Sequence, residues 1–291
     1  MGWKSIADLI TTDGAADVAL VGAPMEAGSV TPGRCDLAPE TIRRTLRRFS
    51  TYDVVIGAEL GLRVADAGDA QVQGVMPAEG YAAIVEQVQR CTSAHRLTIL
   101  LGGNNAVTRP AAHALGVPLA EVGLITLDAH FDLRETDQGL LNGNPIRALL
   151  EDGLPGSNIC QVGLAPYANT AKMHADAQAA GIGVWTIADC RKLGIVPILK
   201  QALARIGHTR SVMIDFDIDV IDRSQCPGAP GARPGGMPVD MFFEAARFLA
   251  ADPRVKLVDL TEFDPSLDVS DITALTAGRW VCEILAGCSA R

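Results

Sequence analysis

Acidic residues recur at every second position in two short stretches of this chain. One is Asp215, Asp217 and Asp219 within IDFDID (214–219), and the other is DAHFD (128–132), where a histidine takes the middle place. Side chains two positions apart on a strand point to the same side, so each stretch could gather its polar groups on one face. Gathered carboxylates repel one another unless a cation neutralises them, which predicts a divalent metal ion.

Each stretch taken alone has a simpler explanation. The carboxylates at 215–219 could form the solvent face of an edge strand, and the triplet at 128–132 could be a satisfied loop network. The apolar lead-in Val212, Met213 and Ile214 argues against the first, because such a run is typical of a strand buried on both faces. Two alternating sets that each follow a buried strand favour a metal site.

The expected ligands are mostly oxygen atoms. The carboxylates come from Asp128, Asp132, Asp217 and Asp219, and one imidazole comes from His130. This set suits Mn²⁺ better than Zn²⁺, which prefers more nitrogen or sulfur, or Mg²⁺, which usually keeps several waters. Four carboxylates would offset the charge of two divalent ions. A water held between those ions would ionise readily and supply a hydroxide nucleophile at neutral pH.

The segments that must position these residues alternate between strand and helix patterns. Strands are predicted over 16–23, 62–67, 97–101, 122–127, 158–163, 183–187, 210–222 and 255–260, and helices over 40–49, 81–91, 172–180, 241–249 and 271–285. The alternation predicts an α/β fold: a three-layer α/β/α sandwich with a mostly parallel sheet of about eight strands, in one domain over 1–291. Ligands in such sheets bind at the carboxyl ends of the strands. Glu262 ends the last of these strands, at the same edge.

Composition excludes several other classes of protein. The chain has 291 residues, of which 48% are hydrophobic and 20% charged, a balance typical of a sizeable buried core. A net charge of −9 with no basic block argues against nucleic acid as a partner. No apolar run approaches the roughly 20 residues that span a bilayer, and no signal-peptide pattern is present. Seven scattered cysteines indicate reduced, buried thiols and a cytoplasmic location.

Several motifs together resemble the ureohydrolase family, which includes arginase, agmatinase and formimidoylglutamase. They are GGNN (102–105), DAHFD (128–132), QVGLAPYAN (161–169), DFDID (215–219), the Pro/Gly loop CPGAPGARPGG (226–236) and TEFDP (261–265). The similarity covers nearly the whole chain. It implies an arginase-like fold, a binuclear manganese centre, hydrolysis of a guanidino or formimidoyl C–N bond in a small molecule, and a homotrimer or homohexamer.

The resemblance also implies a role for individual residues. Asp128 and Asp217 would bridge two metals, Asp132 would complete one site with Asn105, and His130 with Asp219 would complete the other. One ion instead of two is the alternative. Asp132 or a water would transfer the protons, because no histidine is placed to do so. Glu262 would hold the substrate's amidinium, because paired N–H donors match the two oxygens of a carboxylate.

Two positions depart from the family pattern. Asn105 stands where the family has a histidine ligand, so only a weaker amide oxygen could complete the first site. Asn142, within NGNP (142–145), replaces the histidine that shuttles a proton in arginase and agmatinase, and we expect it to contact substrate instead. The chain's other histidines, His95, His113, His174 and His208, are interpreted as structural or surface residues.

Phe131 and Arg134 point to the formimidoylglutamase branch of the family. Arg134 is expected to contact a carboxylate of an anionic substrate such as N-formimidoyl-glutamate, because a guanidinium binds carboxylates in a fixed geometry. A surface ion pair with Glu135 or Asp137 is the alternative. Arg233, in the Pro/Gly loop, is interpreted as a loop residue, with a second contact to a substrate anion as the alternative.

Two other functions remain open. One is a different guanidino-acid hydrolase of the arginase, agmatinase or N-hydroxyarginine type. The other is a non-catalytic, metal-depleted homologue that acts as a structural or regulatory subunit, which the two asparagines at positions 105 and 142 motivate.

Overall fold

A parallel β-sheet forms the centre of this molecule. The computed structural model describes residues 3–11 and 16–291, and nine strands within them form one sheet in the order β1-β5-β2-β6-β11-β10-β7-β8-β9. The strands are β1 (Ile10–Thr11), β2 (Val18–Ala23), β5 (Val64–Asp69), β6 (Leu97–Gly102), β7 (Val122–Leu127), β8 (Ile159–Leu164), β9 (Gly183–Thr186), β10 (Ser211–Asp217) and β11 (Val255–Thr261). Every pairing in the sheet is parallel. A separate antiparallel hairpin pairs β3 (Tyr52–Asp53) with β4 (Ala58–Glu59).

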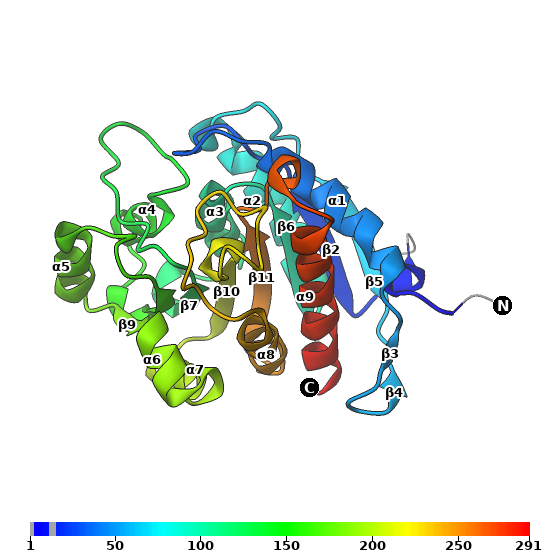
Figure 1. The fold of residues 1–291 in the computed structure, drawn as a ribbon. Coiled ribbons are helices and arrows are strands. Elements are labelled where there is room, and N and C mark those ends of the chain that lie inside the picture. The colour runs from blue at the N-terminus through cyan, green and yellow to red at the C-terminus, as the bar shows by residue number, and fades with distance from the viewer. Residues whose placement is uncertain (1–2, 12–15) are drawn as a thin grey trace.

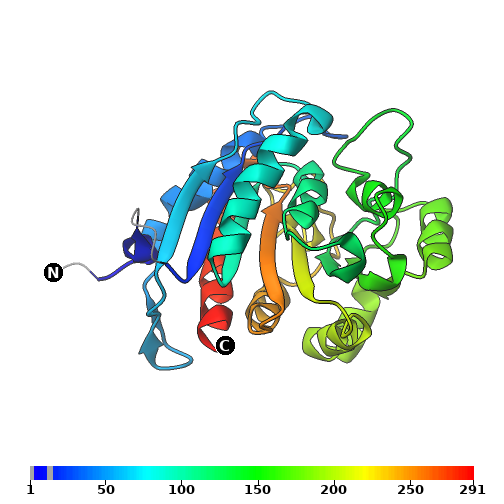
Figure 2. The ribbon, with the colours of Figure 1, turned by 180° about the vertical axis from the view of Figure 1, so that it is seen from behind.

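Helices cover both faces of the sheet, so the expected three-layer sandwich is confirmed (Figures 1 and 2). One face packs against α1 (Ala38–Thr45), α6 (Ile187–Leu193), α7 (Ile195–Arg205), α8 (Val239–Ala250) and α9 (Ile272–Ser289). The other face packs against α2 (Pro77–Ala94), α3 (Thr108–His113), α4 (Pro145–Glu151) and α5 (Ala171–Ala180). The two layers bury the strands from both sides, which explains the continuous apolar runs in the sequence.

Most of the elements that the sequence did not predict are short. The exception is α7, whose buried Ile195, Ile198, Leu199 and Ala202 follow a helical period that was not recognised. β1 has two residues and pairs with β5 at the edge of the sheet, so it cannot show alternation. α3, α4 and α6 are six or seven residues long. Helices of this length lie below the window in which a helical repeat can be recognised, and packing against the sheet stabilises them.

Two properties bear on the environment of the chain. None of the helices in the described ranges is long and apolar enough to cross a bilayer. All seven cysteines are free, and all but Cys282 are buried. Burial raises the pKa of the Cys160 thiol to about 12, so this side chain acts as apolar filler.

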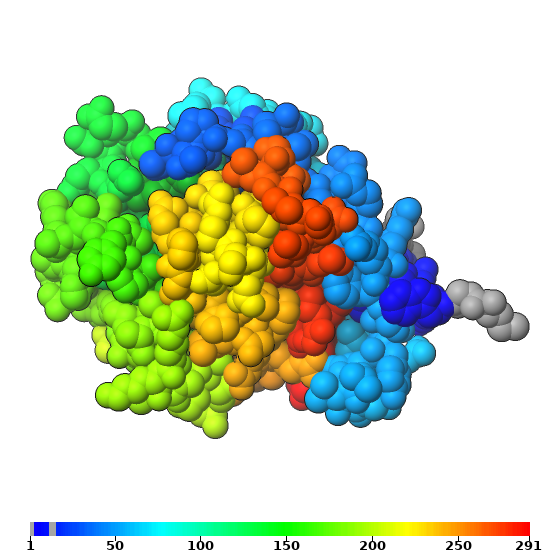
Figure 3. All heavy atoms as spheres, viewed as in Figure 1, coloured from blue at the N-terminus to red at the C-terminus, as the bar shows by residue number. Residues whose placement is uncertain are grey.

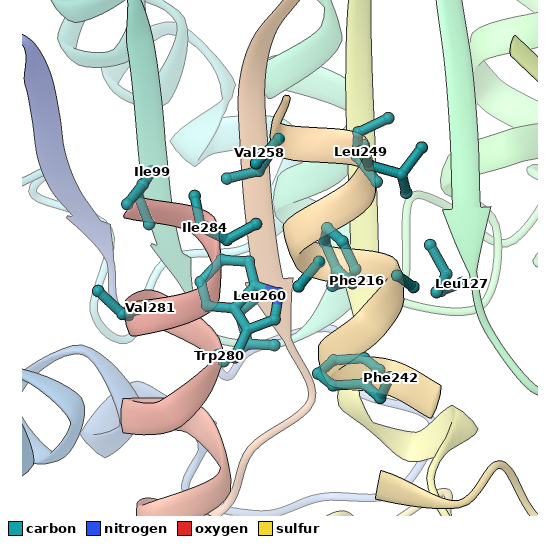
Figure 4. Close-up of a cluster of buried hydrophobic side chains, with 14 of the residues drawn as sticks. Ile99, Leu127, Phe216, Phe242, Leu249, Val258, Leu260, Trp280, Val281 and Ile284 are labelled. Carbon is teal, nitrogen blue, oxygen red and sulfur yellow. The ribbon is translucent and has the colours of Figure 1, made fainter. Parts of the chain in front are cut away.

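Aromatic side chains fix the central strands against the helices of one face (Figure 4). Phe216 of β10 contacts Phe242 of α8 and Trp280 of α9 edge-on, with ring centroids 5.4 Å apart in both pairs. All three side chains are fully buried. Edge-to-face packing of this kind adds to the stabilisation from burial. The strand that leads into Asp217 therefore has a rigid support.

Replacement of Trp280 by Ala should lower the free energy of unfolding by about 3–5 kcal/mol, because it leaves a large cavity beside Phe216. Trp3 offers a matched control, since it is 63% exposed whereas Trp280 is 0% exposed. Urea denaturation followed by circular dichroism measures both variants. Equal, small losses for the two variants would contradict this description of the core.

Candidate metal centre

The carboxyl ends of three adjacent strands bring the acidic residues together. β10 lies between β7 and β11, with Phe216 opposite Leu127 and Asp217 opposite Thr261. The residues that follow these strands therefore emerge at the same level of one edge. Five acidic side chains meet there, and none exposes more than 7% of its surface: Asp128, Asp132, Asp217, Asp219 and Glu262.

Of the alternating residues, only Asp215 and Asp217 lie on a strand, so the expectation of a strand that continues to Asp222 is wrong, whereas the strand expected over 122–127 is confirmed. β7 ends at Leu127, and β10 ends at Asp217, where a 3₁₀ turn over Ile218–Val220 begins. Asp128 Oδ1 accepts a hydrogen bond from the backbone N–H of His130 (2.7 Å), and Asp217 Oδ1 accepts one from that of Asp219 (2.9 Å). Aspartate favours such turns because its side chain binds the backbone two residues on. The spacing of two comes from turn geometry.

His130 lies between two of the carboxylates. Its Nδ1 is 3.1 Å from Asp219 Oδ2 and 3.4 Å from Asp128 Oδ1. The negative charge of Asp219 raises the pKa of His130 to about 12, and burial raises the pKa of Asp128 to about 6. A proton on His130 and a divalent cation are thus alternative ways to balance the same buried negative charge.

The donor set at this point fits a divalent cation. One ligand atom each from Asp128, His130 and Asp219 lies within 4.8 Å of the others. Asp219 Oδ1 is buried and has no hydrogen-bond partner among the described residues. A buried carboxylate oxygen without a donor is costly, and a cation would satisfy it. Burial and the charges of Asp219 and Asp128 also raise the pKa of Asp217 well above its usual range.

Asn105 is arranged differently from the expected ligand. Its Nδ2 donates a hydrogen bond to Asp132 Oδ2 (2.6 Å), while its Oδ1 accepts from the hydroxyls of Thr108 (2.7 Å) and Thr261 (3.1 Å). The amide oxygen is thus engaged on the side away from Asp132. In this arrangement Asn105 positions a proposed ligand, and it would have to turn its amide to become one.

Asp215 does not join the cluster, although it precedes Asp217 by two residues. It lies deeper in the sheet, opposite Asp259 of β11, and both are 0% exposed. The hydroxyl of Thr108 is 3.4 Å from Asp215 Oδ1 and 3.2 Å from Asp259 Oδ2. Burial raises the pKa of Asp259 to about 7 and that of Asp215 well above its usual range. This pair forms a polar layer beneath Asn105.

Above the carboxylates opens a cavity of about 170 Å³. The acidic cluster lies at its base, and several loops together with α5 supply its walls. The loops contribute Val30 and Thr31, then Arg134 and Asn142, then Asn169, then Arg233 of the Pro/Gly loop. Figure 3 shows the surface of the yellow Pro/Gly segment next to the blue and green segments. The interpretation of Arg233 as a mere loop residue therefore needs revision, because the structure brings it to this cavity.

Glu262 is held in a fixed orientation at the base of the cavity. Its backbone has a φ of 62°, a left-handed conformation that a non-glycine residue adopts only when its surroundings impose it. Its Oε1 accepts from the backbone N–H of Asn105 (2.7 Å) and from Asn142 Nδ2 (2.9 Å). Oε2 has no such partner among the described residues and is left for a ligand. Burial raises the pKa of Glu262 to about 7.

The side chain of Asn142 connects two segments that line the cavity. Its side-chain Oδ1 accepts from the backbone N–H of Val30 (2.8 Å), while its Nδ2 binds Glu262. The side chain thus links the early loop to the residue at the base. An amide cannot transfer protons as a histidine can, so Asn142 acts here through hydrogen bonding alone.

Sequence reasoning missed Asn169, which lines the same cavity. Its Oδ1 accepts from the backbone N–H of Phe131 (2.8 Å), and its Nδ2 donates to the carbonyl of Ala129 (2.9 Å). The two bonds fix the peptides on either side of His130. The signal was its position at the end of QVGLAPYAN (161–169), a motif already noted for its resemblance to the family.

The other histidines stay outside the cavity lining, as expected. His174 of α5 stacks on Phe131 with ring centroids 5.6 Å apart, and His113 lies 2.9 Å from Asp152 near the surface. His208 contacts Asn158 on the far side of the chain from these loops.

Replacement of Gly231 by Ala should weaken manganese binding by roughly 10- to 100-fold, because the loop passes directly over a proposed ligand. A Cβ at Gly231 would lie 1.9 Å from Asp219 Oδ2 and 2.9 Å from its Cγ. The carboxylate would have to move. Calorimetric titration with Mn²⁺ measures the change, and Gly61→Ala is the control, since a Cβ at Gly61 meets nothing within 4 Å. Equal affinities in the two variants would show that Asp219 is not a ligand.

Comparisons with known proteins agree on one family. The Arginase family profile matches residues 16–287. Formimidoylglutamase of Bacillus subtilis (strain 168) is 30% identical over 97% of this chain and 91% of its own length. Its crystal structure superposes with a TM-score of 0.92 at 29% identity, covering 98% of this chain and 92% of that one.

Two further proteins are similar to this chain over most of its length. The crystal structure of Trypanosoma cruzi formiminoglutamase, described with Mn²⁺, has a TM-score of 0.92 at 21% identity and covers 100% of both chains. Mitochondrial guanidino acid hydrolase of Homo sapiens is 27% identical over 92% of this chain and 77% of its own length.

Proposed function

Because this chain belongs to the arginase family of hydrolases, we propose that it cleaves the amidine C–N bond of N-formimidoyl-glutamate with manganese as its cofactor. The observation that carries the choice of substrate is the environment of Arg134. It lines the cavity that also holds Glu262, and the described residues give it no acidic partner. The alternative ion pair with Glu135 is not formed, since Glu135 instead lies 2.6 Å from Lys172 and 3.9 Å from Arg147.

The proposed metal ligands are the residues inferred from the sequence except Asn105, whose amide oxygen accepts hydrogen bonds from Thr108 and Thr261. The residues that would hold two manganese ions are Asp128, His130, Asp132, Asp217 and Asp219. When bound, manganese lowers the pKa of a coordinated water so that a strong nucleophile is present at neutral pH. Support comes from the oxygen-rich donor set and from the Mn²⁺ in the Trypanosoma cruzi structure of the same fold.

The chain's own residues would orient the substrate and move its protons. Glu262 Oε2 accepts hydrogen bonds from the amidinium and fixes the amidine carbon above the carboxylates. Asp132, held by Asn105, accepts a proton from the attacking water and returns one to the nitrogen that leaves with glutamate. The C–N bond to glutamate then breaks, and the products are formamide and glutamate.

A guanidino acid is the second candidate substrate, since one relative is a guanidino acid hydrolase. A guanidinium would meet Glu262 as an amidinium does, and its carboxylate would meet Arg134. The products differ, because a guanidino group releases urea whereas a formimidoyl group releases formamide.

The test is turnover of matched amidines by the manganese-loaded protein. Four compounds are compared by NMR detection of formamide or urea: N-formimidoyl-L-glutamate, 4-guanidinobutyrate, L-arginine and agmatine. We expect formamide from the first, with the highest kcat/KM. Preferential release of urea would show that the substrate is a guanidino acid. No turnover of any compound by protein that retains manganese would favour a non-catalytic subunit.

We also propose that the chain works in the cytoplasm as a homo-oligomer. The seven free cysteines support a reducing compartment. The trimeric or hexameric state rests on the resemblance described above, and light scattering of the purified protein tests it.

A further inference from the structure

We propose that Arg134 and Arg233 together bind the two carboxylates of a dicarboxylic substrate, so that Arg233 selects against amidines with a single carboxylate. This inference rests on the proposed function and deepens it, because it assigns a residue to the second negative charge. Both arginines line the cavity above the metal centre, and they come from loops almost a hundred positions apart in the sequence.

The two arginines lie at the outer end of the cavity. Both are exposed residues, whereas Asp132, Asp217 and Glu262 at the base are buried. A substrate cation is therefore favoured at the base and substrate anions at the rim. N-formimidoyl-glutamate has this distribution of charge, with one amidinium at one end and two carboxylates beyond it.

Arg233 presents one edge of its guanidinium for a ligand. Its Nη1 donates to the carbonyls of Gly231 (2.7 Å) and Ala232 (3.1 Å), while Nε and Nη2 have no partner among the described residues. The N–H groups of Nε and Nη2 are parallel, which is the geometry that binds both oxygens of a carboxylate. The bonds at Nη1 hold this edge in place before the ligand arrives.

The loop around Arg233 is itself anchored. The backbone N–H of Arg223 donates to the carbonyl of Arg233 (3.1 Å), and Arg223 Nη1 donates to the carbonyls of Ala229 (2.8 Å) and Pro230 (3.2 Å). A loop fixed by these contacts loses little freedom when it binds a substrate, which favours affinity.

Arg134 is positioned from the opposite wall. Its backbone N–H donates to the carbonyl of Gly143 (3.1 Å). Its side chain passes directly over that glycine, where a Cβ would lie 2.7 Å from Cδ and 2.9 Å from Nε. A glycine at 143 is thus required for this path of the side chain. The guanidinium of Arg134 has no hydrogen-bond or ion-pair partner among the described residues, so all of its donors are available.

A substrate with one carboxylate would leave one of these arginines unpaired. Charge-assisted bonds between a guanidinium and a carboxylate are stronger than neutral ones, so the second pair should add roughly tenfold or more to kcat/KM. The selectivity for a dicarboxylate over a monocarboxylate should then disappear when either arginine loses its charge.

The experiment compares Arg233→Gln with wild type on three substrates. They are N-formimidoyl-L-glutamate and two analogues, one without the α-carboxylate and one without the side-chain carboxylate. We expect kcat/KM for the dicarboxylate to fall roughly tenfold, mainly through KM, and kcat/KM for one of the two analogues to stay unchanged. Arg134→Gln should leave kcat/KM for the other analogue unchanged. Equal losses on all three substrates, or no loss, would overturn the proposal.

A binding measurement separates this proposal from the assignment of the reaction. Calorimetry of L-glutamate with the manganese-loaded protein should show a roughly tenfold weaker Kd in Arg233→Gln than in wild type. Arg210→Gln is the control, because the Arg210 side chain is 70% exposed and pairs with Glu121. If wild-type protein binds glutamate through Arg233 but cleaves no amidine, the proposed reaction is wrong and the two-arginine site stands. If the protein is active but Arg233→Gln leaves its affinity for glutamate unchanged, the two-arginine site is wrong and the proposed reaction stands.

Discussion

Replacement of Asp217 by Asn is expected to lower manganese affinity by more than roughly 100-fold and to reduce turnover to background. Asp217 is 3% exposed, lies between β7 and β11 at the end of β10, and faces the cavity. Asparagine keeps the size of the side chain and an oxygen that can still accept from Asp219 N–H. The variant therefore removes one negative charge with little change in shape, and calorimetric titration with Mn²⁺ measures the loss.

The same variant should be more stable than wild type when manganese is removed by chelation. Burial and the neighbouring Asp219 and Asp128 raise the pKa of Asp217, so its charge destabilises the metal-free fold. A rise in Tm without metal, together with loss of the manganese-induced rise, is the expected pair of results. Asp137→Asn, an exposed residue outside the cavity lining, is the control. If Asp217→Asn binds manganese with the affinity of wild type, Asp217 is not a metal ligand.

Replacement of Glu262 by Gln should reduce kcat/KM for N-formimidoyl-glutamate by roughly 10- to 100-fold without loss of metal. Glutamine can still accept from the backbone N–H of Asn105 and from Asn142 Nδ2, so the position of the side chain is retained. What is lost is the negative charge opposite the amidinium. Steady-state kinetics and elemental analysis of the same sample measure the two quantities.

The control for this variant is Glu244→Gln, at an exposed position of α8 outside the cavity lining. Glu262→Gln protein that has lost its manganese would make Glu262 a metal ligand, contrary to the role proposed here. Unchanged kcat/KM with full metal content would remove Glu262 from substrate binding altogether.

The sequence was sufficient for the three-layer architecture with a parallel sheet and for the edge of the sheet at which the acidic residues gather. Long apolar strands such as β7 and β10 have an unambiguous signal because helices bury them on both faces, and alternation with helices dictates parallel pairing. Parallel strands end at one edge, so residues after Leu127, Asp217 and Thr261 had to meet. The nature of the residues there, acidic and imidazole, then indicated a metal.

Contacts between distant segments could not be predicted. The orientation of Asn105 depends on Thr108 and Thr261, and Thr261 is 156 positions away. Asp215 follows the same spacing as Asp217, yet its opposite neighbour in the sheet, Asp259, places it in a separate layer. Arg233 reaches the cavity only because the Pro/Gly loop folds over Asp219. Sequence spacing describes neighbours along the chain, and these arrangements depend on neighbours across it.

The most direct test of the metal centre is the manganese content of the chain, measured by elemental analysis after loading with Mn²⁺ and exhaustive dialysis. We expect about two ions per chain, held by the carboxylates of Asp128 and Asp217 and completed by Asp132, His130 and Asp219. A chain that retains no manganese, and that gains no thermal stability when manganese is added, would contradict the proposal that this buried acidic cluster is a metal centre.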